Sequence, residues 1–260
     1  MKGNARIIVF VGIVLFIIVL VLLNMTVFTV KEITVLNEVE SQLIDEDSII
    51  SNSDIHIGSN IFVISEKKSK DMIEVTHPYL EVKGIERVFP NKVIIHVSVR
   101  IPLMAIKVAD TQLYAVVDSS LKILQIIDST DSIYKTCTKV EGIEITNPQV
   151  GNSLDLDNSY NSKLSVISYV ADNESLDGVA FLNFFESISF DNSDDIVKVK
   201  LRSGVTVLLK NSDNYEDKFR YALAAYRLYG EQSPKRTYGY IYHDTQDKAW
   251  EWSENYPYSE

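Results

Sequence analysis

Serine and lysine side chains three residues apart are the groups in this sequence most suited to chemistry. Ser65-x-x-Lys68 and Ser132-x-x-Lys135 both fit the Ser-x-x-Lys motif of penicillin-binding proteins, in which the serine is the nucleophile of acyl transfer. Such four-residue patterns arise easily in a chain that contains many Ser and Lys residues. Ser65 also stands where a helix needs an N-cap, because a serine hydroxyl satisfies an open backbone N–H there.

The other motifs of that enzyme class do not complete the site. Ser212-Asp213-Asn214 fits the second motif, but the third, Lys-Thr-Gly, is absent. Its nearest relative, Arg202-Ser203-Gly204, comes before the second motif, whereas the third motif should follow it. The sequence therefore favours structural roles for these serines.

Other catalytic, cofactor and metal arrangements fail in the same way. No histidine has a second ligand at a metal-like spacing, and no His-Glu-x-x-His occurs; the histidines are His56, His77, His96 and His243. There is no Gly-x-Ser-x-Gly elbow, no Gly-rich phosphate loop and no dinucleotide fingerprint. We predict no catalytic, cofactor-binding or metal-binding residue, and no enzymatic activity.

Charge is distributed unevenly along the 260 residues. Lys2 and Arg6 are the only charged residues in the first thirty, so the formal net charge of −11 leaves −13 on the rest of the chain. Nucleic-acid binding requires clustered Lys and Arg to neutralise phosphates, and the nearest approach to a cluster is the pair Lys235-Arg236. Nucleic acid is therefore not an expected partner.

The segment from Ile7 to Leu23 is unbroken apolar sequence, and no charge follows until Lys31. At about 1.5 Å per helical residue, the uncharged run can reach roughly 36 Å, enough to cross a hydrocarbon core of about 30 Å. A cleaved signal peptide would need a shorter apolar core and a small-x-small cleavage site. We therefore predict a transmembrane helix at 7–25 after a cytoplasmic stub at 1–6, with the bulk of the chain outside the cell because of the preceding cations.

The region after the apolar run predicts a small α+β unit. A strand ends near Asn37, an acidic helix start follows near Asp45, and a second helix is expected between Ser65 and Pro78. Two strands hinged at Pro90-Asn91 come next. Period-two alternation places valines and Ile95 on one face of the second strand, and it assigns His96 and Arg100 to a polar, non-catalytic face.

From about residue 111 the pattern changes to short strands parted by turns, which predicts a mainly antiparallel β-domain with helices. One helix has Leu164, Ile167, Ser168 and Ala171 at helical spacing, and another runs from about Asn214 to Tyr229. A last strand, "RTYGYIYHD", precedes an acidic aromatic tail at 245–260. Cys137, a lone cysteine, is expected to be buried.

The order of these parts resembles the FtsQ/DivIB family of bacterial cell-division proteins. The most specific segment, "HPYLEVKGIERVFPNKVIIHVSVRIPLMAI", resembles that family's Pro-aromatic pair, its Arg-x-x-Pro-Asn hairpin and the Arg-x-Pro that follows. "IHIGSNIF" resembles the junction between its two helices. The matching positions are Gly58, Asn60, Phe62, Pro78, Tyr79, Arg87, Pro90, Asn91, Arg100, Pro102, Asp118, Gly142, Gly151 and Gly204. Val99 stands where the family usually has Glu, and the cytoplasmic stub is far shorter than in many members.

The resemblance implies a POTRA domain at 26–102, a β-domain at 103–244 and no catalysis. It implies a scaffold in the divisome that connects FtsL, the FtsB/DivIC-type partner and the septal peptidoglycan synthase FtsW with its penicillin-binding protein. The expected location is the bacterial cell membrane at the division septum, with one helix in the lipid bilayer.

The resemblance also implies that a partner of the FtsB type docks at the end of the β-domain by adding a strand. An edge strand offers N–H and C=O groups that a partner can complete. The expected anchors on the last strand are Tyr238, Tyr240 and Tyr242, with Phe219 and Tyr226 on the preceding helix. The alternative is that the three tyrosines simply pack on that helix.

Two other functions fit parts of the sequence. A membrane-tethered wall enzyme of the penicillin-binding type would use the Ser-x-x-Lys motifs. A POTRA-bearing export or assembly factor would need further POTRA repeats or a membrane barrel, and the sequence shows neither pattern.

Overall fold

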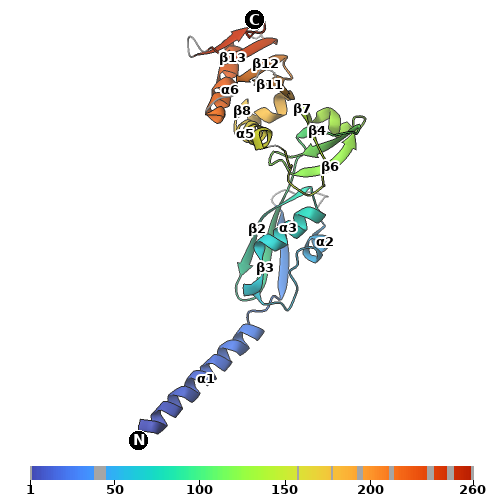
Figure 1. The fold of residues 1–260 in the computed structure, drawn as a ribbon. Helices are drawn as coiled ribbons and strands as arrows, with labels where there is room; N and C mark the ends of the chain where they lie inside the picture. The colour runs from blue at the N-terminus through green and yellow to red at the C-terminus, as the bar shows by residue number, and fades with distance from the viewer. Residues whose placement is uncertain are drawn as a thin grey trace. The chain divides into compact units, whose positions relative to one another are not determined.

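The computed structural model describes residues 2–37, 45–156, 158–176, 178–191, 196–210, 214–232, 237–244 and 249–258. The chain divides into two compact units, Met1–Arg100 and Ile101–Glu260 (Figure 1). The first unit begins with helix α1, Lys2–Thr26.

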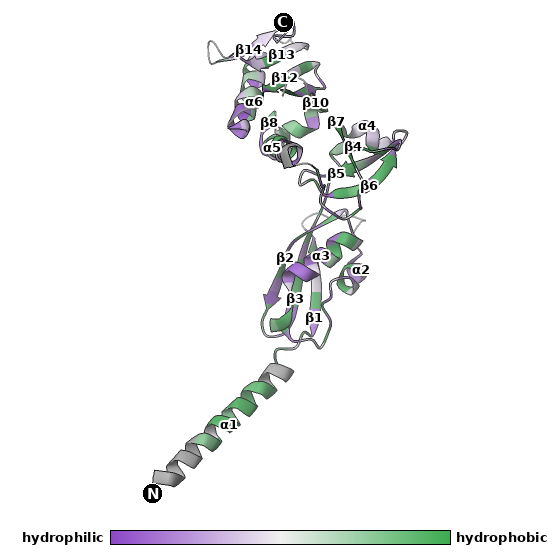
Figure 2. Cartoon of the chain, viewed as in Figure 1, coloured by the Kyte–Doolittle hydropathy of each residue, from purple (hydrophilic) through white to green (hydrophobic). Residues whose placement is uncertain are grey.

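Helix α1 presents apolar side chains outward along its described part. The side chains from Phe10 to Leu22 are all exposed, and Figure 2 colours this stretch as hydrophobic. Among the residues described, no helix has the length and apolar character needed to span a membrane.

The rest of the first unit has the predicted order of strand, helix, helix, strand and strand. A three-stranded sheet has the order β1-β3-β2, in which β1 is parallel to β3 and β2 is antiparallel to it. The elements are β1 (Glu32–Asn37), α2 (Glu46–Ser51), the 3-10 turn η1 (Ile61–Val63), α3 (Glu66–Thr76), β2 (Leu80–Val88) and β3 (Lys92–Val99). The hairpin expected at Pro90-Asn91 is confirmed.

The core of the first unit lies between this sheet and its helices. Val93, Ile95 and Val97 of β3 are fully buried, as the alternation predicted, together with Ile49 of α2 and Ile73 of α3. Packing of these side chains is what holds two short helices that would be marginal alone. Ser65 is the N-cap of α3, because its hydroxyl accepts the Lys68 N–H at 3.4 Å.

One expectation about β3 is wrong. His96 does lie on the polar face, 3.1 Å from Glu86 of the neighbouring strand. Arg100 does not, because β3 ends at Val99 and the alternation ends with it. Arg100 is instead buried, with its guanidinium 3.1 Å from the buried Glu74 carboxylate and its Nε donating to the Leu80 carbonyl at 3.0 Å.

The second unit is built on a nine-stranded sheet with the order β14-β13-β12-β11-β10-β7-β4-β5-β6. Its strand pairs are antiparallel except β4–β7, β7–β10 and β12–β13, which agrees with the predicted mainly antiparallel domain. The strands are β4 (Met104–Val108), β5 (Leu113–Val117), β6 (Ile123–Asp128), β7 (Thr138–Ile145), β10 (Phe185–Asp191), β11 (Ile196–Leu201), β12 (Val205–Lys210), β13 (Gly239–His243) and β14 (Trp250–Ser253).

Helices α5 and α6 cover one face of this sheet, called the inner face, whereas the short helix at 132–136 packs on the opposite face against Ala105, Val116 and Cys137. The predicted stripe of α5 is buried, and the α6 side chains Phe219, Ala222 and Leu223 join the same core as Val199, Val207 and Ile241 of the strands. The remaining elements are α4 (Ser132–Thr136), α5 (Asn158–Asn173), the small hairpin β8 (Ser175–Leu176) and β9 (Val179–Ala180), η2 (Phe181–Phe184) and α6 (Tyr215–Gln232). Helix α6 continues past Gly230, where the sequence predicted its end.

Candidate partner-binding surface

Strand β13 carries the tyrosines that the sequence assigns to partner binding. Ile241 points into the helix-covered core and is 1% exposed, so alternation turns Tyr240 and Tyr242 to the opposite face, called the outer face. Strand register extends this face inward in two rows of side chains. One row is Tyr240, Thr206, Lys200, Ser187 and Lys139, and the next begins at Tyr242 and continues through Leu208, Lys198, Ser189 and Glu141.

The outer face concentrates positive charge in a chain whose net charge is −11. A hollow of about 520 Å³ over β7, β10, β11, β12 and β13 is lined by more cations than carboxylates. The cations are Lys135, Lys139, Lys198, Lys200 and Arg202, and the carboxylates are Glu141 and Glu186. Glu186 is paired with Lys200 at 3.0 Å, and Glu141 accepts the Ser189 hydroxyl at 2.6 Å. No motif of the sequence predicts this face, and the one local signal for it is that Lys198 and Lys200 alternate with buried valines.

Two of these cations, Lys139 and Arg202, donate hydrogen bonds to backbone carbonyls at the C-terminal end of α4. Lys139 donates to the Cys137 carbonyl at 2.5 Å and to the Tyr134 carbonyl, and burial lowers the pKa of this lysine. Arg202 donates to the Thr136 carbonyl at 2.7 Å. Together they satisfy carbonyls that the end of a helix leaves open. Cys137 is buried as predicted, and burial raises the pKa of its thiol.

The structure corrects the expectation that β13 is the edge strand. β14 pairs with it antiparallel, with Tyr240 opposite Ser253 and Tyr242 opposite Glu251, while β12 occupies the other side. Both backbone edges of β13 are therefore used within the chain. The sequence predicts residues 250–253 to be part of a tail, because four residues, "WEWS", do not give a strand signal by themselves.

The residues after β14 return across the outer face. Tyr256 stacks edge-on against Tyr240 at a centroid distance of 5.5 Å, and Tyr258 does the same against Tyr242 at 6.0 Å. Lys198 lies over the Tyr256 ring at 5.3 Å, and Lys210 lies over the Tyr258 ring at 5.8 Å. These four tyrosines are called the tyrosine ladder. It shows that the β13 tyrosines do not pack on α6, which was the alternative interpretation.

The helix residues expected at this site lie elsewhere. Phe219 is fully buried on the inner face, 6.1 Å from the Phe185 ring, so a partner cannot touch it in this structure. Tyr226 packs against Phe181 at 6.0 Å, also on the inner side. Tyr238 is 51% exposed, and its hydroxyl donates to Glu254 at 3.1 Å, a bond that raises the pKa of the phenol. Of the five predicted residues, only the three tyrosines near β13 lie together.

Strand β14 is the outermost strand at this end of the sheet, among the strands described. The Asp244 N–H donates to the Ala249 carbonyl at 2.8 Å, which makes these two residues a hydrogen-bonded pair. Such pairs alternate in an antiparallel ladder, so the backbone groups of Trp250 and Trp252 point away from β13. The Trp250 carbonyl accepts the Tyr229 hydroxyl at 3.0 Å, and both indole rings pack against the core.

The motif residues of the first unit fix turns and ion pairs. Asn60 caps η1 by accepting the Phe62 N–H at 2.9 Å, and Arg87 donates to the Ile64 carbonyl at 2.7 Å. The Asn91 carbonyl accepts the Lys31 N–H at 2.7 Å. Gly58 has φ +90°. Pro78 and Tyr79 precede β2, and the Tyr79 carbonyl accepts the Arg100 N–H at 2.8 Å. Each contact organises the fold, and none of them assembles reactive groups.

The motif residues of the second unit also have structural positions. The buried Asp118 accepts the Ser120 and Lys122 N–H groups at 3.0 and 2.8 Å and so closes the β5–β6 turn. A Cβ at Gly142 would lie 2.1 Å from the Phe190 carbonyl oxygen, and one at Gly204 would lie 2.1 Å from the Thr237 carbonyl oxygen. Both glycines also have positive φ, so a side chain at either position would clash with the neighbouring carbonyl and would strain the backbone.

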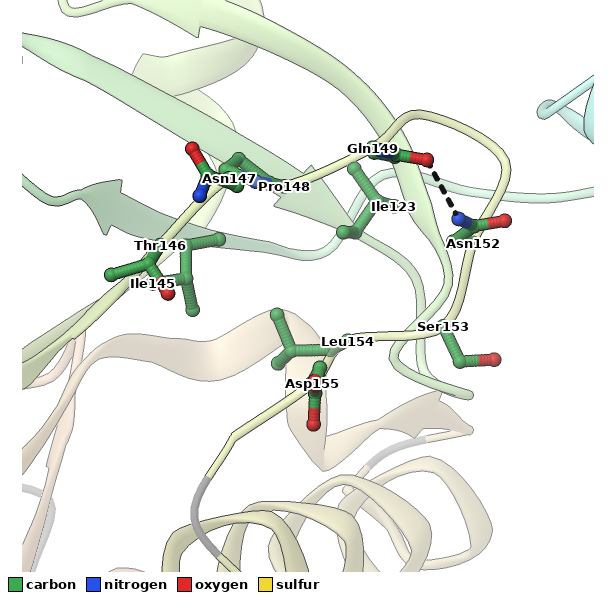
Figure 3. Close-up of a pocket in the computed structure, with 10 residues that line it drawn as sticks. All are labelled: Ile123, Ile145, Thr146, Asn147, Pro148, Gln149, Asn152, Ser153, Leu154 and Asp155. Carbon is green, nitrogen blue, oxygen red and sulfur yellow. Dashed lines mark hydrogen bonds between the residues drawn. The ribbon is translucent and has the colours of Figure 1, made fainter.

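A second hollow, of about 310 Å³, lies at the loop after β7 (Figure 3). Asn152 donates to Gln149 at 3.3 Å across the loop, and Gly151 between them has φ +86°. Its other lining groups are small polar or apolar side chains, with Asp155 as the single charge among them. The lining therefore contains no nucleophile–base pair.

The structure does not assemble the acyltransferase motifs. Ser65 caps α3, and Ser132 begins the short helix α4 behind its N-cap Asp131. Ser212 and Asp213 lie outside the described residues. No group of three His, Cys, Asp or Glu side chains that could hold a metal occurs in the described part of the chain.

Comparison with known proteins gives this arrangement a family context. The family described as "POTRA domain, FtsQ-type" matches residues 28–99, which contain the strand–helix–helix–strand–strand unit. Residues 28–99 are an FtsQ-type POTRA domain. The match ends at Val99, within a residue of the boundary between the two compact units.

The chain is also a distant homologue of DivIB cell division proteins. It is 28% identical over 141 residues to "Cell division protein DivIB" of Clostridium acetobutylicum, an alignment that covers 54% of this chain and 53% of that protein. It is 29% identical over 115 residues to the protein of the same name from Clostridium tetani, covering 44% and 42%. The chain thus aligns with about half the length of the curated relatives it matches.

Proposed function

We propose that this chain is a non-enzymatic scaffold of bacterial cell division. The FtsQ-type POTRA domain and the distant homology to DivIB support this role. The proposed partners are FtsL, an FtsB/DivIC-type protein, and FtsW with its penicillin-binding protein. The observation that carries the proposal is a POTRA domain followed by a large sheet whose terminal hairpin forms an edge.

The proposed partner site is the outer edge of β14 together with the adjoining outer face. A partner segment pairs there as a tenth strand, because β14 is the outermost of the described strands at this end, and the Trp250 carbonyl shares or exchanges its bond from the Tyr229 hydroxyl when the partner binds. Tyr238 is exposed beside this edge, while Tyr240 and Tyr242 lie on the adjoining outer face against Tyr256 and Tyr258. Tyr is favoured at interfaces. The cations of the outer face add an attraction for an acidic partner.

We also propose that α1 anchors the chain in the cell membrane, with the N-terminus in the cytoplasm. Support comes from the apolar run Ile7–Leu23, from the exposed side chains of Phe10–Leu22, and from Lys2 and Arg6 ahead of the run. Both compact domains then lie outside the cytoplasm, at the division septum.

Imaging of a fluorescent fusion tests the division role. The proposal predicts a ring at midcell that forms before constriction, whereas a uniform membrane signal contradicts it. Deletion of 237–260 tests the partner site and is expected to abolish capture of the FtsB/DivIC-type protein. The wall-enzyme alternative predicts a covalent adduct when the chain is incubated with a fluorescent β-lactam, and the scaffold predicts none.

A further inference from the structure

Three phenylalanine rings meet on the surface of the POTRA domain and are called the phenylalanine cluster. Phe62 lies 5.2 Å from Phe28 and 5.3 Å from Phe89 between ring centroids, and Phe28 lies 6.4 Å from Phe89. Phe62 is 52% exposed and Phe89 is 55% exposed, although both pack against other rings. Large apolar side chains gathered at a surface in this way mark an interaction site.

Further exposed apolar side chains come from the loop that carries Phe62. Ile57 is 63% exposed and Val63 is 75% exposed. Neither side chain is needed to fill the core, which Ile55 and Ile61 of the same loop supply from fully buried positions. The loop therefore buries Ile55 and Ile61 in the core of the domain and leaves Ile57, Phe62 and Val63 exposed on its surface.

Hydrogen bonds hold the cluster beside the end of α1. The Phe28 carbonyl accepts the Ile61 N–H at 2.9 Å, which ties the loop to the segment that leaves the helix. The Lys31 N–H donates to the Asn91 carbonyl at 2.7 Å, which ties the tip of the β2–β3 hairpin, and with it Phe89, to the same segment. Three regions distant in sequence are thereby joined at the point where the POTRA domain begins.

The chain between α1 and the cluster is very short. α1 ends at Thr26, and Phe28 follows two residues later, so the connection spans about 7 Å at most. The Thr29 hydroxyl donates to the Thr26 carbonyl at 3.3 Å, which shortens the path further. Whatever surface α1 emerges from must lie next to the cluster.

We propose that the phenylalanine cluster inserts into the outer interface of the lipid bilayer, as a second membrane contact of the POTRA domain. This inference rests on the proposed anchoring by α1, which brings the cluster to the bilayer surface. Exposed Phe and other apolar side chains bury about 5–10 Å into the boundary between headgroups and acyl chains. Lys31 and Arg87, both exposed next to the cluster in sequence, can reach lipid phosphates with their cationic ends. The two contacts together restrict how the POTRA domain tilts above the membrane.

Fluorescence quenching by brominated lipid tests this contact on the full chain. Trp250 and Trp252 are replaced by Phe, Phe62→Trp is introduced, and the protein is reconstituted in vesicles of phosphatidylglycerol and phosphatidylcholine. We expect lipids brominated in the upper acyl chain to remove at least about half of the indole fluorescence from position 62, given the insertion depth above.

Val75→Trp is the matched control. Val75 is also 52% exposed and lies on the same domain, but near the C-terminal end of α3. That end is held to the start of β2 by the Leu80 N–H, which donates to the His77 carbonyl at 2.9 Å, whereas Phe89 follows the far end of β2. The nine residues of β2 span roughly 25–30 Å between the end of α3 that carries Val75 and the tip of the hairpin that carries Phe89, so no quenching is expected at position 75.

The outcomes separate this inference from the proposed anchor. Quenching at position 62 and not at 75 supports the bilayer contact. No quenching at either position, in protein that floats with the vesicles and resists carbonate extraction, overturns the contact and leaves the anchor standing. Protein that does not float with vesicles overturns the anchor and the contact together. Quenching that disappears only when a partner protein is added would still support the contact in the unbound chain.

Discussion

The two units of the chain differ in which aromatic rings and ion pairs they bury and which they leave exposed. The POTRA domain buries an ion pair, Glu74 with Arg100, and leaves the rings of Phe62 and Phe89 half exposed. The second unit leaves its ion pairs partly exposed and covers the rings of β13 with its own C-terminal tyrosines. One unit thus presents aromatic surface directly, while the other presents an edge and keeps its aromatic face closed.

The comparison indicates which contacts stabilise each unit and which surface of each unit is open to a binding partner. A buried ion pair contributes strongly only while both partners are present, because removing one leaves an unpaired charge in the core. The edge-to-face pairs of the tyrosine ladder each contribute modestly to the stability of the second unit, so the C-terminal tyrosines can leave the outer face at little cost. Substitutions in the two units should therefore differ in their effect on stability.

The largest effect is expected from Arg100→Met. The variant removes the buried cation of the Glu74 carboxylate and leaves only the partly exposed Lys70 at 3.6 Å, which costs about 3–5 kcal/mol. In the full chain in detergent, hydrogen exchange of β2 and β3 peptides should accelerate by roughly two to three and a half orders of magnitude. Lys67→Met, which removes an exposed cation from α3 of the same domain, serves as the matched control. The double variant Glu74→Leu/Arg100→Met should recover most of the lost protection, and equal protection in wild type and Arg100→Met would contradict the assignment.

A smaller effect is expected from the tyrosine ladder. In a double-mutant cycle, Tyr240→Ala and Tyr256→Ala should show a coupling free energy of about 0.5–1.5 kcal/mol, the usual range for an edge-to-face pair. Urea unfolding followed by Trp250 and Trp252 fluorescence reports on this unit directly. Tyr221→Ala, an exposed tyrosine on α6, should show no coupling to Tyr256→Ala. Zero coupling between positions 240 and 256 would mean that the tail does not cover the outer face in solution.

The smallest effect is expected from Glu174, whose carboxylate lies 2.8 Å from Arg227 and 2.9 Å from Arg220. The hydrogen bond from Arg227 lowers the pKa of this carboxyl below its ordinary value of 4.5. A lowered folded-state pKa stabilises the protein above the unfolded-state pKa, and this stabilisation is lost as the pH falls through the folded-state value. Glu174→Gln should therefore be less stable than wild type at pH 7, by less than Arg100→Met, and the gap should narrow as the pH falls below the ordinary carboxyl pKa of 4.5. A gap that stays constant with pH would rule out the ionised pair.

Much of the POTRA domain is predictable from the sequence because its signals are local. Alternation in β3, the Pro90-Asn91 turn and the Ser65 N-cap each depend on a few neighbouring residues, and the structure has all three. The helix stripe of α5 is local in the same sense. Patterns of period 2 and 3.6 therefore recover the elements themselves.

The features that decide the surfaces depend on distant residues. Arg100 is buried because Glu74 lies across the core from it, and no alternation rule contains that partner. β14 forms because β13 offers a free ladder to four residues with little strand signal of their own. The phenylalanine cluster joins residues 28, 62 and 89, which are brought together only by the folded domain. For this reason the sequence predicts β13 as the edge strand, whereas the structure has β14 outside it.

The proposed partner site can be tested by locking the terminal hairpin. His243 and Trp250 face each other as a non-hydrogen-bonded pair of β13 and β14, where Cα atoms lie about 4.5 Å apart and a disulfide fits. In His243→Cys/Trp250→Cys, oxidation fastens β14 to β13, and reduction releases it within the same folded molecule. The buried Cys137 stays apart from this exchange because burial raises the pKa of its thiol.

The most direct measurement is the affinity of this variant for the FtsB/DivIC-type protein of the same organism, compared between the oxidised and reduced states. If the partner strand adds to the outer edge of β14, the two affinities are equal. If the partner instead replaces β14 on β13, binding is lost on oxidation and returns on reduction, which would contradict the account.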